Sequence, residues 1–235
     1  MTEKIYVEEN SKYLQSNPTW HVEDSPWKAK QILKMLTRNS LEPKSIIEVG
    51  CGVGEILNQL YEVMPNDVNF IGYDISQDAI SLAKERENER LHFKHENFLE
   101  TDHKHDLLLM IDVFEHVDDY LGFLKACINK SEYTIFHIPL DIDVLGVLRN
   151  VPIKTRKSVN HLHYFTKNTA LATLVDCGYE VLDSFYTAGM LELPNKKLKT
   201  KIAAIPRKLM FGINKDFAVK LLGGYSLLVL AKNKN

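Results

Sequence analysis

The sequence predicts an α/β protein with a doubly wound, mostly parallel sheet of seven strands. Short apolar runs alternate with segments of helical apolar spacing along most of the 235 residues, which is typical of repeated strand–helix–strand units. The run DLLLMI at 106–111 is apolar over most of its length, as expected of a strand that helices cover on both faces. We therefore expect 106–111 at the centre of the sheet.

The order of the apolar runs gives the expected strands. They fall at 45–49, 69–73, 91–93, 106–111, 133–138, 179–186 and 225–231. Ser25 before Pro26, Ser76 and Thr166 are expected to begin helices, because their hydroxyls can accept a hydrogen bond from a free backbone N–H. Gly178 is expected just after the helix that Thr166 begins. These signals place helices between the strands, as the fold class requires.

Residues 187–224 depart from this alternation and predict a helical cap inserted before the last strand. Apolar residues recur there at intervals of four, three and four, namely Leu198, Ile202, Ile205 and Leu209. Pro206 is expected to interrupt this helix, because proline lacks the N–H that the helix needs.

The charge of the chain is unevenly distributed. Its net charge is −2, which argues against a general nucleic-acid binder, and no tetrapeptide of the N/D-P-P-Y/F type is present. Residues 191–220 hold eight basic and two acidic residues, so this segment carries +6. A basic patch raises the local concentration of anionic ligands or of an anionic membrane, although a solvated helix face is the simpler alternative.

The cysteines and the apolar runs indicate a cytoplasmic protein. The three cysteines, Cys51, Cys127 and Cys177, are far apart and odd in number, and they show no CxxC spacing. No apolar run approaches the roughly 20 residues of a membrane-spanning helix, and no export signal is recognised at the N-terminus.

A glycine-rich turn is expected directly after the first strand. The segment 48–54, EVGCGVG, ends that strand and opens a helix. Its glycines permit positive φ and a close approach of the backbone to a ligand. Asp74 ends the second strand, about 20 residues further on, where a carboxylate can accept hydrogen bonds from both hydroxyls of a ribose. A nicotinamide-type G-x-G-x-x-G pattern needs a third glycine where this chain has Glu55, so a different nucleotide-type ligand is favoured.

Several segments together resemble the class I S-adenosylmethionine (SAM) dependent methyltransferases. They are IIEVGCGVGEIL at 46–57, which resembles motif I, GYDIS at 72–76, DVFEHVDD at 112–119, HIP at 137–139 and HLHYFTKNTALATLVDCGYEV at 161–181. The resemblance covers roughly residues 45–186 and the last strand. It implies a Rossmann-like sheet with an antiparallel last strand, SAM as cofactor and S-adenosylhomocysteine as product.

The resemblance also implies a set of SAM-binding residues. Glu48 and the glycines would face the methionyl part of SAM, Asp74 would hold the ribose, and Asn97 stands where the family often has an acid for the adenine amino group. The full set is Glu48, Gly50, Cys51, Gly52, Gly54, Asp74, Ile75, Asn97, Phe98, Asp112 and Phe114.

Three histidines are the candidate catalytic residues. His116 follows the central strand, where it borders both donor and acceptor in the resembling family, or else caps the next helix. His161 and His163 flank one residue, so on an extended segment both would point the same way and one could act as base. Asp141 and Asp143 are the best further ligands for a two-histidine metal site, but no acid with compelling spacing completes it, and no metal is expected.

Residues 41–235 are expected to form the SAM-binding domain, with the cap inside it. Residues 1–40 are expected to form an N-terminal helical lid, in which Trp20, His21 and Trp27 pack over the site.

The sequence thus predicts a SAM-dependent methyltransferase that acts on a small-molecule, sugar, glycan or lipid-linked acceptor, at oxygen. The +6 segment favours an anionic acceptor and peripheral membrane contact through the cap. No nucleic-acid partner is expected. The alternatives are N-methylation of a small amine and a non-catalytic SAM-binding or scaffolding protein.

Overall fold

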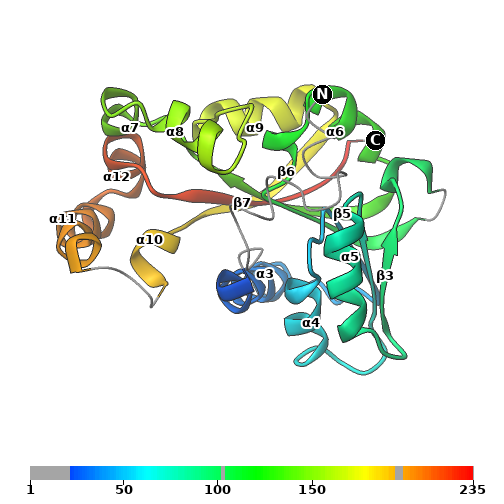
Figure 1. Ribbon diagram of the computed structural model, residues 1–235. Coiled ribbons are helices and arrows are strands. Elements are labelled where there is room, and N and C mark those ends of the chain that lie inside the picture. Colours follow the sequence, from blue (N-terminus) through cyan, green and yellow to red (C-terminus); the bar gives the residue numbers. More distant parts are fainter. Residues whose placement is uncertain (1–21, 102–103, 194–197, 235) are drawn as a thin grey trace.

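The computed structural model describes residues 22–101, 104–193 and 198–234, and for 198–203 the backbone alone. Figure 1 shows one twisted sheet between two layers of helices. The strands are β1 (Ser45–Val49), β2 (Asn69–Asp74), β3 (Leu91–His95), β4 (His105–Ile111), β5 (Ser131–Pro139), β6 (Tyr179–Thr187) and β7 (Ser226–Asn233). The helices are α3 (Ser25–Arg38), α4 (Glu55–Tyr61), α5 (Gln77–Ala83), α6 (Tyr120–Cys127), α7 (Val144–Leu148), α8 (Val151–Ser158), α9 (Lys167–Asp176), α10 (Gly189–Glu192), α11 (Leu198–Ile213) and α12 (Lys215–Leu222).

The sheet has the order β3-β2-β1-β4-β5-β7-β6, with β1 to β5 parallel to one another. β7 is antiparallel to both of its neighbours, β5 and β6. The predicted fold class and the central place of the DLLLMI strand are confirmed. Because β6 runs in the same direction as β1 to β5, the segments that follow β1, β2, β4, β5 and β6 all start at one edge of the sheet.

Both faces of the sheet are buried, each against its own set of helices (Figure 1). α3, α4 and α5 cover one face, and α6 and α9 cover the other. Neighbouring residues of β1 show the alternation of a strand, since Ile46 packs in one buried cluster and Ile47 in the other. A strand covered on both sides must be apolar at successive positions, which explains the run in β4.

All three predicted helix starts are confirmed, but only two of the three residues cap their helix. Ser76 accepts a hydrogen bond from the backbone of Ala79 at 3.3 Å, and Thr166 begins α9 with a capping box. Gly178 follows α9 with a φ of +99°. Ser25 is the first residue of α3 and not its cap, because the 3₁₀ turn at Val22–Asp24 places Asp24 at the N-cap position.

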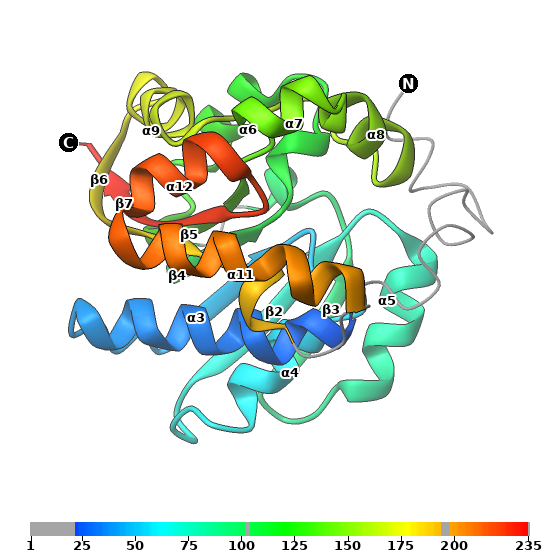
Figure 2. The same ribbon diagram turned by 90° about the vertical axis from the view of Figure 1, so that its left-hand side faces the viewer.

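The segment 187–224 forms α10, α11 and α12, in agreement with the predicted cap. Figure 2 shows these helices in front of the sheet edge at which β5 and β6 end. The prediction that Pro206 interrupts the helix is wrong, since α11 is continuous through it. A single proline removes only one backbone hydrogen bond of the helix. The packing of α11 against α12 remains. In addition, the Arg207 guanidinium of α11 donates hydrogen bonds to the carbonyls of Leu222 and Gly223 at the end of α12. Within the described part of the chain, no helix is both long and apolar enough to cross a membrane.

Candidate active site at the carboxyl edge of the sheet

A cavity of about 1230 Å³ lies at the edge where the parallel strands end. The glycine turn after β1, the segments after β4 and β5, α3 and α10 all contribute to its wall. Sites for one small ligand usually measure about 300–1,000 Å³, so this cavity has room for two ligands side by side.

The glycine turn is held open by hydrogen bonds to the end of β2. Gly50 and Cys51 donate their backbone N–H groups to the carbonyl of Tyr73, at 2.8 and 3.1 Å. Gly50 and Gly52 have φ angles of +68° and +53°, which side chains rarely tolerate. Asp74 accepts from the backbone N–H of Gly52 at 2.8 Å, so the carboxylate at the end of β2 also fixes the turn.

Glu48 lies buried at the cavity wall, and its Oε2 atom has no hydrogen-bond partner within the described residues. Burial raises the pKa of this carboxyl to about 8, with a further increase from the charge of Asp74 and an opposing effect of the nearby Lys28 ammonium. A buried carboxylate without partners is unfavourable until a donor or a cation reaches it. Glu48 is therefore suited to binding an ammonium group in the cavity.

Asp112, at the end of β4, belongs to a network that joins four elements. Its carboxylate lies 2.7 Å from Lys28 Nζ of α3 and 2.6 Å from His137 Nδ1 of β5, and His137 Nε2 lies 2.9 Å from Thr187 Oγ1. Burial raises the pKa of Asp112, but the charges of His137 and Lys28 hold this pKa well below its usual range. Asp112 also has a φ of +55°, so the contacts on both sides hold a strained backbone.

The sequence-based reasoning did not single out Lys28 or His137. His137 stands in the HIP segment that carried the family resemblance, so a signal was present, whereas nothing around Lys28 marks it as a site residue.

Trp27 connects α3 to the cap across the cavity. Its indole Nε1 donates to Glu192 Oε2 of α10 at 2.7 Å, and its ring meets the edge of His137. Trp27 and the α10 residues Gly189 and Met190 all line the cavity. The predicted lid stays a prediction, and Trp20 and His21 lie outside the described residues.

The predicted cofactor residues do not all reach the cavity. Those that line it are Glu48, Gly50, Cys51, Gly52, Asp74, Ile75, Asn97 and Asp112. Gly54 instead begins α4, where an added Cβ would lie 2.3 Å from the ring of Phe93. Phe98 and Phe114 are buried in the core cluster, and Leu99 lines the cavity next to Asn97. A direct role for Gly54, Phe98 and Phe114 in binding thus has no support from their positions.

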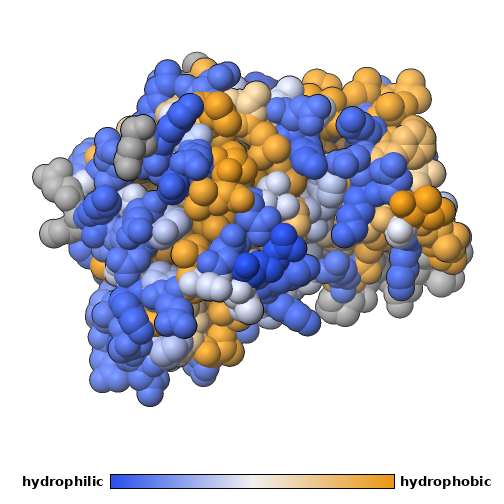
Figure 3. Space-filling view, turned by 180° about the vertical axis from the view of Figure 1, so that it is seen from behind, coloured by the Kyte–Doolittle hydropathy of each residue, from blue (hydrophilic) through white to orange (hydrophobic). Residues whose placement is uncertain are grey.

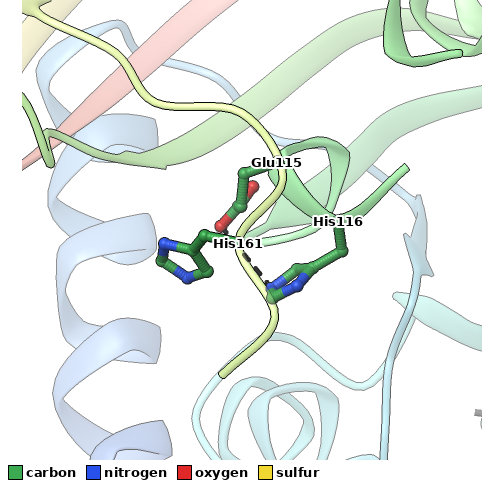
Figure 4. Close-up of side chains that lie close together, drawn as sticks. All are labelled: Glu115, His116 and His161. Atoms are coloured by element: carbon green, nitrogen blue, oxygen red, sulfur yellow. Dashed lines mark ion pairs between the residues drawn. The ribbon is translucent and has the colours of Figure 1, made fainter. Parts of the chain in front are cut away.

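A cluster of Glu115, His116 and His161 forms another part of the site (Figure 4). The two histidines line the cavity, and Glu115 lies behind them, fully buried, with no hydrogen-bond partner for either carboxylate oxygen within the described residues. His116 Nε2 is 4.0 Å from Glu115 Oε1, and the two imidazole centres are 4.9 Å apart. Burial raises the pKa of Glu115 well above its usual value and lowers that of His116 to about 4.

Both histidines of the cluster are oriented through Nδ1. His161 Nδ1 lies 2.5 Å from Asp141 Oδ2, and His116 Nδ1 lies 3.1 Å from the carbonyl of Asn160. A carbonyl and an ionised carboxylate can only accept, so each Nδ1 carries the hydrogen. When such an imidazole is neutral, its lone pair is on Nε2.

The other predicted groups lie elsewhere. His163 donates from Nε2 to the carbonyl of Val117 at 2.8 Å, packs on Tyr120 and does not line the cavity. The Asp143 carboxylate caps α7 by accepting from Gly146 at 2.7 Å. The sequence reasoning placed Asp141 and Asp143 with the histidines but overlooked Glu115, which stands beside His116 in the chain.

Comparisons with known proteins identify the family. Residues 22–184 match the methyltransferase domain family. No curated protein sequence matches the chain.

Solved methyltransferase structures share the fold at low sequence identity. The Haloferax volcanii putative methyltransferase, solved in complex with the activator Trm112, gives a TM-score of 0.63 at 14% identity, over 95% of this chain and 94% of that one. The magnesium protoporphyrin IX methyltransferase of Synechocystis PCC 6803 gives a TM-score of 0.58 at 14% identity, over 97% of this chain and 90% of that one. The N-methyltransferase NodS of Bradyrhizobium japonicum WM9 gives a TM-score of 0.57 at 14% identity, over 100% of this chain and 97% of that one.

These comparisons agree with the fold described above, and they confirm the predicted family, enzyme class and cofactor. The chain belongs to the methyltransferase domain family, and by family and fold it is a class I SAM-dependent methyltransferase.

Proposed function

We propose that the chain transfers a methyl group from SAM to a hydroxyl oxygen of a small acceptor. The observation that carries this proposal is that oriented histidines and the glycine turn line one cavity large enough for two ligands. His161, held by Asp141, is placed to act as a base, which an alcohol needs more than an amine does.

The residues at the glycine turn fit SAM. The partnerless oxygen of Glu48 can accept from the methionyl ammonium group. Asp74 uses each carboxylate oxygen for one backbone N–H, from Gly52 and Ser76, and a carboxylate has about four acceptor positions, so two ribose hydroxyls can still be bound. Gly50 has no side chain that would keep a ligand away from its backbone, and an added Cβ would lie 2.9 Å from the Val113 side chain.

SAM supplies a methyl group that is already activated by its sulfonium, so the protein has to align the acceptor and remove its proton. His161 Nε2 can accept a hydrogen bond from the acceptor hydroxyl and take its proton as the oxygen reacts. Asp141 then stabilises the imidazolium at Nδ1. His116 is the neighbouring hydrogen-bonding group on the same wall.

The acceptor is proposed to be anionic and lipid-linked, because the cap has an apolar and basic outer surface. This outer surface, named the cap surface below, consists of α11 and α12 of the cap together with α7 and α8. Figures 1 and 2 show α7, α12 and α11 side by side. Its exposed apolar residues are Val144, Val147, Leu148, Ile153, Ile205, Leu209, Ile213 and Phe217. Apolar side chains gather along the corresponding edge in Figure 3, with hydrophilic residues between them.

The charge of the cap surface complements an anionic membrane. Residues 144–175 contain no acidic residue. The exposed basic residues of the surface are Arg149, Lys154, Arg156, Lys157, Lys208, Lys215 and Lys220. Apolar side chains among basic ones are typical of helices that lie in the interface of an anionic bilayer. Of the lysines that the sequence singled out, Lys197 lies outside the described residues, as do the side chains of Lys199 and Lys201.

The test is transfer of labelled methyl from SAM to chemically distinct acceptors. Hydroxylated acceptors on anionic vesicles should be labelled, and fragmentation of the product in a mass spectrometer should place the added methyl group on oxygen. Labelling of amines alone would replace the proposal with N-methylation, and SAM binding without transfer to any acceptor would indicate a non-catalytic protein.

We further propose a cytoplasmic location, which the three free, buried cysteines support.

A further inference from the structure

The cluster of Glu115, His116 and His161 has the composition of a metal site. One potential ligand atom from each residue lies within 4.8 Å of the other two. Metal–ligand distances of about 2.0–2.2 Å separate donors on opposite sides of an ion by about 4.0–4.4 Å. Small rotations of the side chains therefore bring the three donors around one ion.

The burial of Glu115 indicates a bound cation or donor. Glu115 is fully buried, and neither carboxylate oxygen has a hydrogen-bond partner within the described residues. An acid in such a place destabilises the fold unless a cation or donor satisfies it. A glutamine or a leucine of similar size would fit the same space without an ionisable group, so the carboxylate itself needs an explanation.

The surroundings of the two histidines match those of metal ligands. Ligating histidines usually donate their second ring N–H to a carboxylate or a carbonyl, which fixes the ring and directs the other nitrogen to the ion. His161 does so to Asp141, and His116 does so to the carbonyl of Asn160.

Backbone hydrogen bonds fix the distance between the two parts of the cluster. The carbonyl of Glu115 accepts from the N–H groups of both Leu162 and His163, at 2.8 and 3.1 Å. His163 adds its side-chain bond to Val117. The loop that carries His161 is thereby attached to the segment after β4 on both sides of the cluster.

We propose that Glu115, His116 and His161 bind one divalent first-row transition-metal ion, of the Mn²⁺ or Zn²⁺ kind, whose open positions face the acceptor side of the cavity. Two imidazoles and one carboxylate are a donor set for such ions, and three protein ligands leave positions for water or substrate. The inference rests on the proposed function and changes one role in it. With His161 Nε2 on the ion, the ion would hold and acidify the acceptor hydroxyl, and the proton would pass to solvent instead of to His161. Sequence reasoning expected no metal because it paired the histidines with Asp141 and Asp143 and overlooked Glu115.

The experiment is a Mn²⁺ titration of the full chain without SAM or acceptor, followed by the electron paramagnetic resonance signal of free Mn²⁺. We expect one ion per chain, and Zn²⁺ should compete for it. Glu115→Gln and His161→Asn should abolish stoichiometric binding. Asp141→Asn should weaken it by about 10- to 100-fold, since it removes an orienting group and no ligand. His92→Asn is the matched control, because His92 is exposed on β3 and does not line the cavity.

Thermal unfolding separates metal binding from a structural role. Metal-free Glu115→Gln should melt at the same temperature as the wild type or higher, because it removes a buried partnerless acid, and Mn²⁺ should no longer raise its melting temperature. A lower melting temperature with an unchanged response to Mn²⁺ would overturn the inference. So would a wild-type protein that takes up neither Mn²⁺ nor Zn²⁺.

Methyl transfer is measured on the same samples to keep the two proposals apart. Transfer by a protein that binds no metal would overturn the metal site and leave the proposed function standing. Stoichiometric Mn²⁺ binding that the variants abolish, without transfer to any hydroxylated acceptor, would support the metal site and count against the proposed function.

Discussion

The charge of Glu48 bears directly on the proposed binding of SAM. Its carboxyl is buried with one oxygen partnerless, and burial raises its pKa to about 8. A bound ammonium group favours the ionised form, so binding near neutral pH must release the proton of Glu48.

We therefore predict that the affinity for SAM increases with pH up to about 8. Below that pH it should fall by roughly tenfold for each unit, because protonated Glu48 must first lose its proton. Calorimetric titration in buffers of different ionisation enthalpy measures both the affinity and the released proton. In Glu48→Gln the dependence should be absent. A wild-type affinity that is constant from pH 6 to 8 would contradict the assigned role.

The two histidines of the H-L-H segment should differ in their effect on catalysis. His161→Asn should lower kcat by about 10²- to 10⁴-fold while SAM still binds, because it removes an oriented group on the acceptor wall. His163→Asn should change kcat only severalfold, since that ring binds a backbone carbonyl outside the cavity. Single-turnover kinetics at saturating SAM measure the rate of methyl transfer in both variants. Equal losses in the two variants would contradict it.

Local patterns in the sequence predicted the elements well. The strands and the glycine turn were predictable because each depends on a short stretch of chain, as with the apolar run of β4. The contacts of Lys28 with Asp112 and of His161 with Asp141 join residues 84 and 20 positions apart, and no local pattern encodes them. The alternation argument for His161 and His163 assumed an extended segment. Bonding of Leu162 and His163 to one carbonyl bends the loop and sends His163 to Val117.

At the scale of single elements, the cap helices divide their residues between two tasks. Ala218 and Val219 of α12 are buried against the core, whereas Phe217 beside them is exposed. Ile205, Leu209 and Ile213 are spaced by four residues on α11 and are all exposed. That face has no partner within the described residues of this chain, which is why its apolar character suggests an external surface.

Replacing Leu209 and Ile213 by serine should weaken binding to anionic phosphatidylglycerol vesicles by at least about tenfold, because each buried apolar side chain contributes roughly 1.5–3 kcal/mol. Co-sedimentation with vesicles measures the effect, and added salt should weaken the wild-type interaction. Val63→Ser is the control, since Val63 is nearly as exposed as Leu209 but follows α4 and is not part of the cap surface. Binding that is insensitive to the cap substitutions would show that this face has another partner.

For the whole molecule, a ligand that binds only the folded state should stabilise all of it. SAM at 100 times its Kd adds about 2.7 kcal/mol, and a chain of this size gains about 2–4 °C for each kcal/mol. We predict an increase in melting temperature of about 5–10 °C with SAM and none with NAD. Asp74→Ala should reduce the SAM affinity by about 1–3 kcal/mol and shrink the increase. Gly52→Asp should abolish it, and stabilisation by NAD instead of SAM would contradict the assignment.

The position of β7 has a consequence for the order in which the chain can fold. β7 lies between β5 and β6, and it pairs with Tyr133 near the start of β5 through Lys232. Until residues 226–233 have been synthesised, β6 has no neighbouring strand to join, although β6, α9 and the cap helices all precede β7 in the chain. Parallel pairing of β1 to β5 can proceed without it. Late docking of one strand between two others is a slow, non-local step, so the growing chain passes through a stage in which the edges of β5 and β6 are both open to aggregation or to a chaperone.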